Sequence, residues 1–211
     1  MKLEQLLLEE LSDDEILEIL ERDCQQFLES CDNRFLYRGS KTESKEKTLH
    51  KVKTRKDRAP RDMNGNTHVL IDNYFEKKYG IRYRSASVFT TGSKENAEDY
   101  GSAYAVFPIG EFSFIWSPNV VDLYSNLKAA QTFKKFFSNP FKASKPIVIT
   151  QEVINSYLDT AKYTNDNLGV AIRKGNEIMI SCDEYYIIPL STIKKIKFKR
   201  YVKNMWNKIT K

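Results

Sequence analysis

Short runs of β-forming residues in the second half of the chain restrict its fold more than any other sequence feature. Val, Ile, Tyr and Phe are concentrated at residues 103–108, 111–116, 177–181 and 185–190. Such runs, bounded by turn-forming residues, predict short strands. Helical patterns dominate the first half. Because helices and strands are segregated along the chain, we expect an α+β fold and not a wound parallel sheet.

The N-terminal region carries a clear helix signal. Ser12-Asp13-Asp14-Glu15 is a capping-box sequence, and apolar residues then recur at helical spacing, so we expect an acidic helix over about residues 12–30. We expect its apolar stripe to pack against a sheet; the alternative is a helix that binds a partner. The stripe consists of Ile16, Leu17, Leu20, Cys24, Phe27 and Leu28.

Other elements follow from similar patterns. We expect a strand over 35–39, a helix over 69–79 that ends at Gly80, and a β-like run over 84–91 that turns into a helix carrying Ala97 and Tyr100. The remaining expectations are helices within 120–137 and over 150–158, and strands at 146–149 and 193–198.

Length and composition favour one soluble domain. A chain of 211 residues with 41% hydrophobic and 29% charged residues is long enough for one good core, so we expect a single domain over residues 1–211. No apolar run approaches the roughly 18 residues of a membrane span, and the N-terminus lacks a secretory signal pattern. The chain's three cysteines predict reduced thiols in the cytoplasm, and its two histidines make a metal site improbable.

Charge is distributed unevenly. Residues 1–30 hold ten Asp or Glu against two Lys or Arg, whereas residues 41–61 hold nine basic residues against three acidic ones. Residues 194–211 hold eight basic residues and no acid. We therefore expect a basic insertion over about residues 40–66 and a lysine-rich C-terminal tail. These stretches either attract phosphate-rich partners or are simply solvated.

Three short segments carry the chemical information: Tyr37-Arg38-Gly39, Ser87-Val88-Phe89-Thr90-Thr91 and Glu177-Ile178-Met179-Ile180. In order and strand context they resemble the Arg, Ser/Thr-Ser and Glu triad of the mono-ADP-ribosyltransferases. The resemblance implies a split β-sandwich with flanking helices. It also implies an enzyme that uses NAD as substrate without a metal, cleaves the nicotinamide–ribose bond and transfers ADP-ribose to a macromolecule.

The resemblance also implies roles for individual residues. Arg38 would hold the NAD pyrophosphate, because guanidinium groups bind phosphates through charge-assisted hydrogen bonds. Gly39 has no side chain and would allow the ligand to approach the backbone closely. Thr90 and Thr91 would position the catalytic carboxylate of Glu177, and the rival for that carboxylate is Glu184. The residues expected to stack on nicotinamide are Phe89 and Tyr100.

The sequence departs from the family pattern at two positions. Gly92 stands where a serine is frequent, and Gly175 stands where many members have Glu or Gln, which puts an arginine or asparagine acceptor in doubt. The acceptor could be a protein, RNA or DNA. Candidate acceptor-reading residues lie in two stretches, and they are Tyr163, Asn165, Arg55, Arg58 and Arg61.

These observations predict a toxin, defence enzyme or phage effector of the transferase class, with an inhibitory antitoxin as a possible partner. The alternative is a non-catalytic nucleic-acid-binding protein that uses the same basic stretches. A nuclease ranks below both because the sequence has no paired-carboxylate motif.

Overall fold

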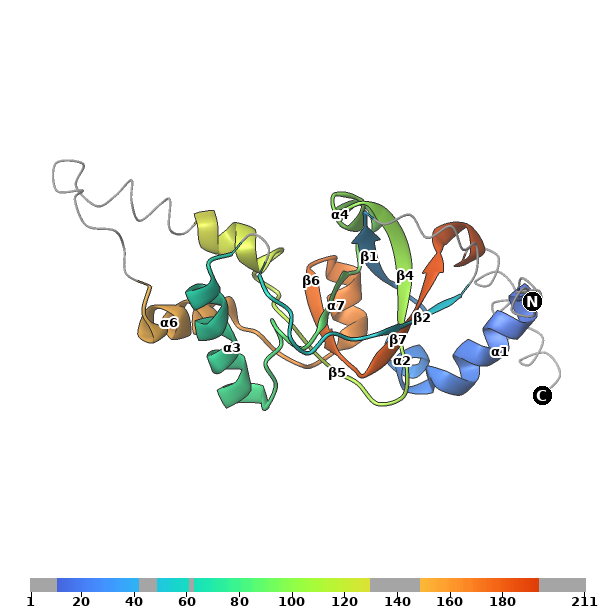
Figure 1. The fold of residues 1–211 in the computed structure, drawn as a ribbon, viewed down its shortest axis with the longest axis horizontal. Helices are drawn as coiled ribbons and strands as arrows, with labels where there is room; N and C mark the ends of the chain where they lie inside the picture. Colours follow the sequence, from blue (N-terminus) through green and yellow to red (C-terminus); the bar gives the residue numbers. More distant parts are fainter. Residues whose placement is uncertain (1–10, 42–48, 61–62, 130–148, 194–211) are drawn as a thin grey trace, which may run out of the picture.

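The fold is α+β, as the segregation of helix and strand patterns predicts. A computed structural model describes residues 11–41, 49–60, 63–129 and 149–193 (Figure 1). In chain order its elements are α1 (Asp13–Asp23), α2 (Gln25–Ser30), β1 (Leu36–Ser40), β2 (His50–Lys53), α3 (Gly65–Tyr79), β3 (Val88–Thr91), α4 (Lys94–Glu98), β4 (Ser102–Pro108), β5 (Ser113–Trp116), α6 (Gln151–Ala161), α7 (Leu168–Lys174), β6 (Glu177–Ser181) and β7 (Glu184–Pro189). Residues 123–129 are also helical.

Seven strands form one antiparallel sheet in the order β2-β7-β4-β1-β3-β6-β5. The sheet is narrowest in its middle, where the register of β1 and β3 has a single residue pair, Tyr37 opposite Thr91. By comparison, β1 pairs with β4 over five residues and β3 pairs with β6 over four. The sheet therefore consists of a four-strand group and a three-strand group joined by one narrow junction.

Hydrophobic cores lie on both sides of β6. Ile178 and Ile180 belong to a core that includes residues of α1, α2 and α7, whereas Met179 between them belongs to a second core with residues of α3 and α6. Alternate side chains of a strand point to opposite faces, so this division follows from the pleat of β6. In Figure 1, α3 and α6 lie at one end of the molecule and α1 and α2 lie toward the other.

The predicted acidic helix exists but is interrupted. The Ser12 hydroxyl accepts a hydrogen bond from the Glu15 N–H, and the Glu15 carboxylate accepts one from the Ser12 N–H, so the capping box is complete. Cys24 leaves the helical conformation (φ −118°, ψ 27°) and separates α1 from α2. Ile16, Leu20 and Phe27 are buried in the first core, which confirms that the apolar stripe packs inside the protein.

Several other expectations need correction. The basic insertion at about 40–66, a long loop or a partly ordered segment by its sequence, contains a strand, β2, which pairs with β7 along the sheet edge. The β-like run at 84–91 forms a strand only from Val88 onward, and α3 begins at Gly65, four residues before the expected start. Residues 190–193 are helical, and residues 194–198 of the strand expected at 193–198 lie outside the described residues. The expected tail at 194–211 and residues 130–148 lie outside the described residues.

Two glycines are explained by packing. A Cβ atom on Gly92 would lie 1.6 Å from the Ile172 carbonyl oxygen of α7, and one on Gly39 would lie 2.0 Å from the Ala97 carbonyl oxygen of α4. Real Cβ atoms do not approach backbone so closely, so neither position accepts a side chain unless a helix shifts. Glycine is therefore required at position 92 because α7 packs directly on the turn after β3.

We predict that Gly92→Ala destabilises the protein by about 3 kcal/mol, because the new methyl group meets backbone that cannot rotate away. Chemical denaturation of both proteins measures the change. Gly65→Ala is the matched control: a Cβ there meets nothing within 4 Å, so its free energy of unfolding stays within about 1 kcal/mol of the wild type. Equal stability of the two variants would contradict the packing of α7 on Gly92.

Candidate active site

A pocket of about 420 Å³ opens where β1 meets β3. Its lining comes from β1, the segment before α3 and the start of α3, the turn before β3, β3, α4 and the residues after it, residues 121–126, and the first residue of β6. Most of the sequence-predicted site residues line this one pocket: Arg38, Gly39, Arg58, Phe89, Thr90, Thr91, Tyr100 and Glu177. Segments that lie far apart in the sequence thus meet at the narrow junction of the sheet.

Glu177 is held at the pocket by its backbone. Its N–H donates to the Val121 carbonyl at 2.7 Å, and the residue lies opposite Thr91 in the β3–β6 register. The Thr90 hydroxyl donates to the Ile178 carbonyl at 2.9 Å, and the Thr91 hydroxyl donates to the Gly175 carbonyl at 2.6 Å. The two threonines therefore fix the backbone on either side of Glu177 and do not bind its carboxyl group directly.

The carboxyl group of Glu177 lies in a poorly solvated and charged environment. Its side chain is 14% exposed, and Arg84 Nη1 lies 3.5 Å from Oε1. Asp122, which also lines the pocket, brings a second carboxyl group close to that of Glu177. Burial, together with the charge of Asp122, raises the pKa of Glu177 to about 7, although Arg84 and Arg58 act in the opposite direction.

Asp122 has a local structural task as well. It precedes the helix at 123–129, and its Oδ1 accepts a hydrogen bond from the Ser125 N–H at 2.7 Å, as an N-cap residue does. This bond fixes one carboxylate oxygen of Asp122 at the start of the helix. The sequence signal for Asp122 is that of a helix cap, so nothing in it pointed to the pocket.

Phe89 has a different environment from the one expected. The guanidinium groups of Arg58 and Arg84 lie 3.9 Å and 4.5 Å from the centre of its ring. Arg38 Nη1 donates to the Phe89 carbonyl oxygen at 3.4 Å. Phe89 is therefore a platform for arginines, in a cation–π arrangement, and its ring faces cations where nicotinamide was expected.

Tyr100 lies in the pocket wall beyond the end of α4, and 58% of its surface is exposed. Its ring is therefore accessible to a ligand, unlike that of Phe89.

Four other sequence-predicted residues lie away from the pocket. Glu184 forms a surface ion pair with Lys51 at 2.6 Å, and Arg55 pairs with Asp57 at 3.4 Å. Tyr163 is buried against Phe75 in the second core, because its aromatic ring fills space between α3 and the sheet. Asn165 is exposed without lining the pocket, and Arg61 lies outside the described residues.

The pocket residues that the sequence did not point to include Arg84, Asp122 and His68. Arg84 lies in the run that was expected to be strand, where an arginine carries no signal of its own. His68 lies in the first turns of α3, and its Nε2 atom lies 3.0 Å from the Ser85 hydroxyl.

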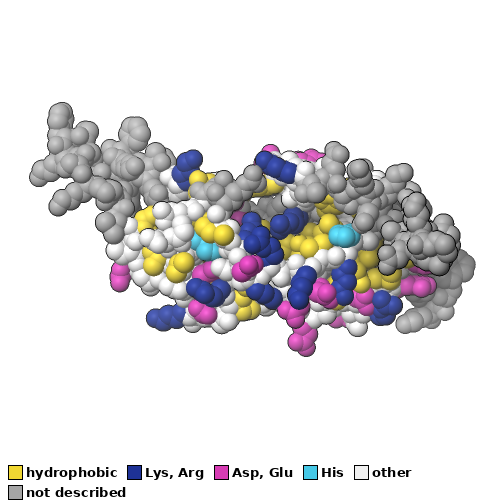
Figure 2. Space-filling model, in the orientation of Figure 1, with side chains coloured by type: hydrophobic (Ala, Val, Ile, Leu, Met, Phe, Trp, Pro, Cys, Tyr) yellow, Lys and Arg dark blue, Asp and Glu magenta, His cyan; other side chains and the backbone are white. Residues whose placement is uncertain are grey.

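Three of the described basic residues of the insertion form surface ion pairs. Besides the pairs of Lys51 and Arg55, Lys56 pairs with Asp183 at 3.0 Å in the turn between β6 and β7. Figure 2 shows Lys and Arg side chains gathered across the middle of one face, with Asp and Glu among them. Arg58 differs from its neighbours, because its guanidinium turns inward to the pocket.

Comparisons with protein-family models, with curated proteins and with solved structures find no match to this chain. Among the residues that the structure describes, no group of three or more His, Cys, Asp or Glu could hold a metal ion. Within the same ranges, no helix is long and apolar enough to cross a membrane.

The pKa of Glu177 predicts a pH-dependent cost to stability. Because its folded-state pKa lies above the usual 4.5, the cost is absent at low pH, grows as pH rises through the interval between 4.5 and about 7, and is complete above it. We predict that Glu177→Gln, which cannot ionise, gains about 2 kcal/mol relative to the wild type between pH 5 and pH 8.

Denaturant titrations at the two pH values measure this difference. Glu184→Gln, which removes a carboxylate whose side chain is 41% exposed at the start of β7, serves as control and should show no comparable pH-dependent gain. A pH-independent effect of Glu177→Gln would show that the carboxyl group is not desolvated.

Proposed function

We propose that this protein is an NAD-dependent mono-ADP-ribosyltransferase, with Glu177 as its catalytic carboxylate. The observation that carries the proposal is the convergence of Glu177 and the guanidinium groups of Arg38, Arg58 and Arg84 in one pocket. A pyrophosphate-bearing nucleotide needs cations, and cleavage of its glycosidic bond needs a carboxylate nearby. This pocket supplies both.

The chemistry follows from the charges that develop. When the C1′–N bond of NAD breaks, nicotinamide leaves as a neutral molecule and the ribose gains oxocarbenium character. An ionised Glu177 that accepts a hydrogen bond from the ribose 2′-hydroxyl would stabilise that charge. The nucleophilic atom of the acceptor then forms a bond to C1′ and loses its proton to solvent. Without an acceptor, water takes its place and NAD is hydrolysed.

The remaining pocket residues fit supporting roles. Arg38 would bind the pyrophosphate, and Thr90 and Thr91 would hold β6 so that Glu177 reaches the ribose. The accessible ring of Tyr100 is the better candidate to stack on nicotinamide, since Phe89 already faces two guanidinium groups. The single bridge between β1 and β3 supports the proposal that the sheet corresponds to the split sandwich of the transferases.

The acceptor is proposed to be a macromolecule. Because acids of the β6–β7 turn and of the insertion itself neutralise Lys51, Lys56 and Arg55, the insertion offers fewer free charges to phosphates than its composition suggests. This favours a protein acceptor over RNA or DNA. Digestion of the labelled product with nuclease or protease separates the two classes.

The central test uses NAD labelled in its adenylate part, purified protein and a cell extract. We predict transfer of label, or slow release of nicotinamide without extract, and a loss of at least about a hundredfold in kcat for Glu177→Gln with NAD binding changed only a few fold. Glu184→Gln is the matched control and should retain activity. A folded wild-type protein that binds nucleic acid but never cleaves NAD would instead support the non-catalytic alternative.

The pKa of Glu177 also predicts a pH profile. Since the ionised form is the active one, kcat/KM should rise about tenfold per pH unit below about pH 7 and reach a plateau above it. Asp122→Asn removes a charge that raises this pKa while keeping a residue that can cap the helix, so the rise should move to lower pH. A profile that is the same in both proteins would exclude Glu177 as the titrating group.

A further inference from the structure

The turn between α3 and β3 brings two pocket arginines together. Arg84 belongs to this turn, and Arg58 lies in the segment before α3. The Arg58 N–H donates to the Ser85 carbonyl oxygen at 3.1 Å, so the backbone next to Arg84 also holds the backbone of Arg58. As a result, both guanidinium groups reach the ring of Phe89.

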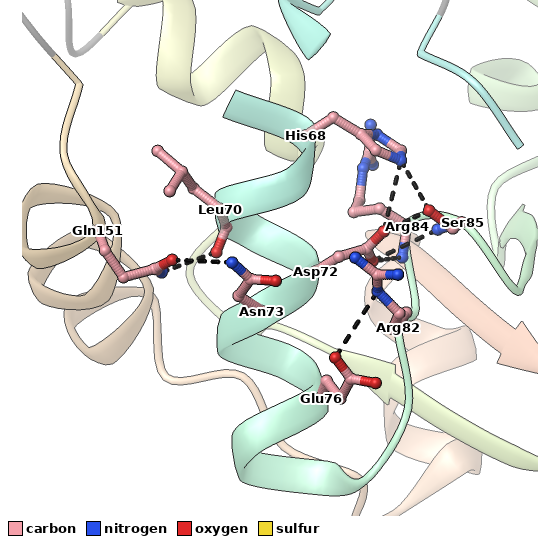
Figure 3. Close-up of polar contacts among 9 residues, drawn as sticks. All are labelled: His68, Leu70, Asp72, Asn73, Glu76, Arg82, Arg84, Ser85 and Gln151. Carbon is pink, nitrogen blue, oxygen red and sulfur yellow. Dashed lines mark hydrogen bonds and ion pairs between the residues drawn. The ribbon is translucent and has the colours of Figure 1, made fainter. Parts of the chain in front are cut away.

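A buried carboxylate on α3 anchors this turn (Figure 3). Asp72 is 1% exposed, and its Oδ1 accepts hydrogen bonds from the Arg84 N–H at 2.7 Å and the Ser85 N–H at 3.4 Å. Its Oδ2 accepts a short hydrogen bond from the Ser85 hydroxyl and lies 3.4 Å from His68 Nε2. A buried carboxylate with this many partners fixes the backbone on which Arg84 is mounted.

Among the described residues, the two guanidinium groups have one carboxylate as an ion-pair partner between them, that of Glu177. In the described ranges, Arg58 forms no ion pair with a carboxylate. The Arg84 side chain is only 10% exposed and lines the pocket, yet its Nε atom has no hydrogen-bond partner among the described residues. Its ion pair with Glu177 is long, at 3.5 Å. Burial and the neighbouring charges of Arg38 and Arg84 lower the pKa of Arg58 to about 10.

We infer that Arg58 and Arg84 form an anion site, built on the Ser85 turn and anchored by Asp72, that binds a phosphate group of a pyrophosphate-bearing nucleotide. With Arg38 the pocket then has three guanidinium groups. Their three positive charges equal the two negative charges of a dinucleotide pyrophosphate plus the one of an ionised Glu177. The identification of this nucleotide as NAD rests on the proposed function. Phosphate binding at the anion site, by contrast, does not require that the protein cleaves NAD. Asp72 acts through Arg84 and is a positioning residue.

Calorimetric titration with inorganic pyrophosphate at fixed ionic strength tests the site. Replacing either arginine by Gln should weaken binding at least about tenfold, because each removes charge-assisted hydrogen bonds. Arg84→Lys should recover part of the affinity but not all, since an ammonium lacks the planar fork. The matched control is Arg82→Gln, which removes a cation two residues away in the same turn that pairs with Glu76 outside the pocket; its affinity should stay within about twofold of the wild type.

The anchoring role is tested by a second pair of variants on α3. Asp72→Asn should weaken pyrophosphate binding and move the pH profile of NAD cleavage to higher pH, because a displaced Arg84 no longer lowers the pKa of Glu177. Glu76→Gln removes the other carboxylate that links α3 to this turn, and it should change neither measurement. Circular dichroism checks that both variants fold, and a failure of Asp72→Asn to fold leaves the arginine titrations decisive.

The outcomes separate this inference from the proposed function. Pyrophosphate binding that depends on Arg58 and Arg84 in a protein that never cleaves NAD would sustain the anion site and reject the transferase. Cleavage of NAD with pyrophosphate affinity unchanged by both substitutions would sustain the transferase and overturn the site. An equal loss of affinity in Arg82→Gln and Arg84→Gln would reduce the effect to general surface charge and also overturn it.

Discussion

The antiparallel pairing of β3 with β6 is the constraint on which the candidate site depends. Its register places Thr91 opposite Glu177 and Phe89 opposite Met179, so these four residues share one face of the sheet. A slip of one residue would turn Glu177 toward the α7 side and expose Met179 to the wrong core. The register is therefore fixed by the burial of Ile178, Met179 and Ile180, and the carboxylate inherits its position from them.

The charged groups of the pocket lie at the junction of β1 and β3, where neighbouring strands of the sheet share the fewest residue pairs. Only one residue pair joins β1 to β3, and the groups that meet there are guanidinium and carboxyl groups instead of backbone ladders. Bringing such groups together in a poorly solvated place is costly unless they are paired. Here Asp72 accepts several hydrogen bonds, whereas among the described residues Arg58 forms no ion pair and the Nε of Arg84 has no hydrogen-bond partner, so the cost is concentrated on the groups that face the cavity. Such an arrangement is typical of a site prepared for a ligand.

Local signals in the sequence predicted local structure well. The capping box at Ser12, the left-handed Gly80 after α3 and the strands β4 to β7 all follow from short patterns. The motif around Arg38 and Glu177 also led to residues that share a pocket. The place of Arg84 in the pocket could not be predicted from the sequence. Its pattern predicts a strand at this position, whereas in the structure the N–H groups of Arg84 and Ser85 donate to the Asp72 carboxylate. These two N–H groups are therefore not available to a strand, and β3 begins only at Val88. The carboxylate that binds them lies on α3, twelve residues before Arg84 in the sequence.

The basic insertion shows why charge counts along a chain mislead about partners. Nine basic residues between 41 and 61 suggest one phosphate-binding surface, but folding sends the described ones to different places. Lys51 and Lys56 pair with Glu184 and Asp183, which are adjacent where the β6–β7 turn enters β7, because β2 pairs with β7. Arg58, a few residues later, hydrogen-bonds to the Ser85 carbonyl and enters the pocket. For a phosphate ligand the important basic residue of the insertion is therefore Arg58, whose backbone hydrogen bond holds it where its guanidinium group lines the pocket.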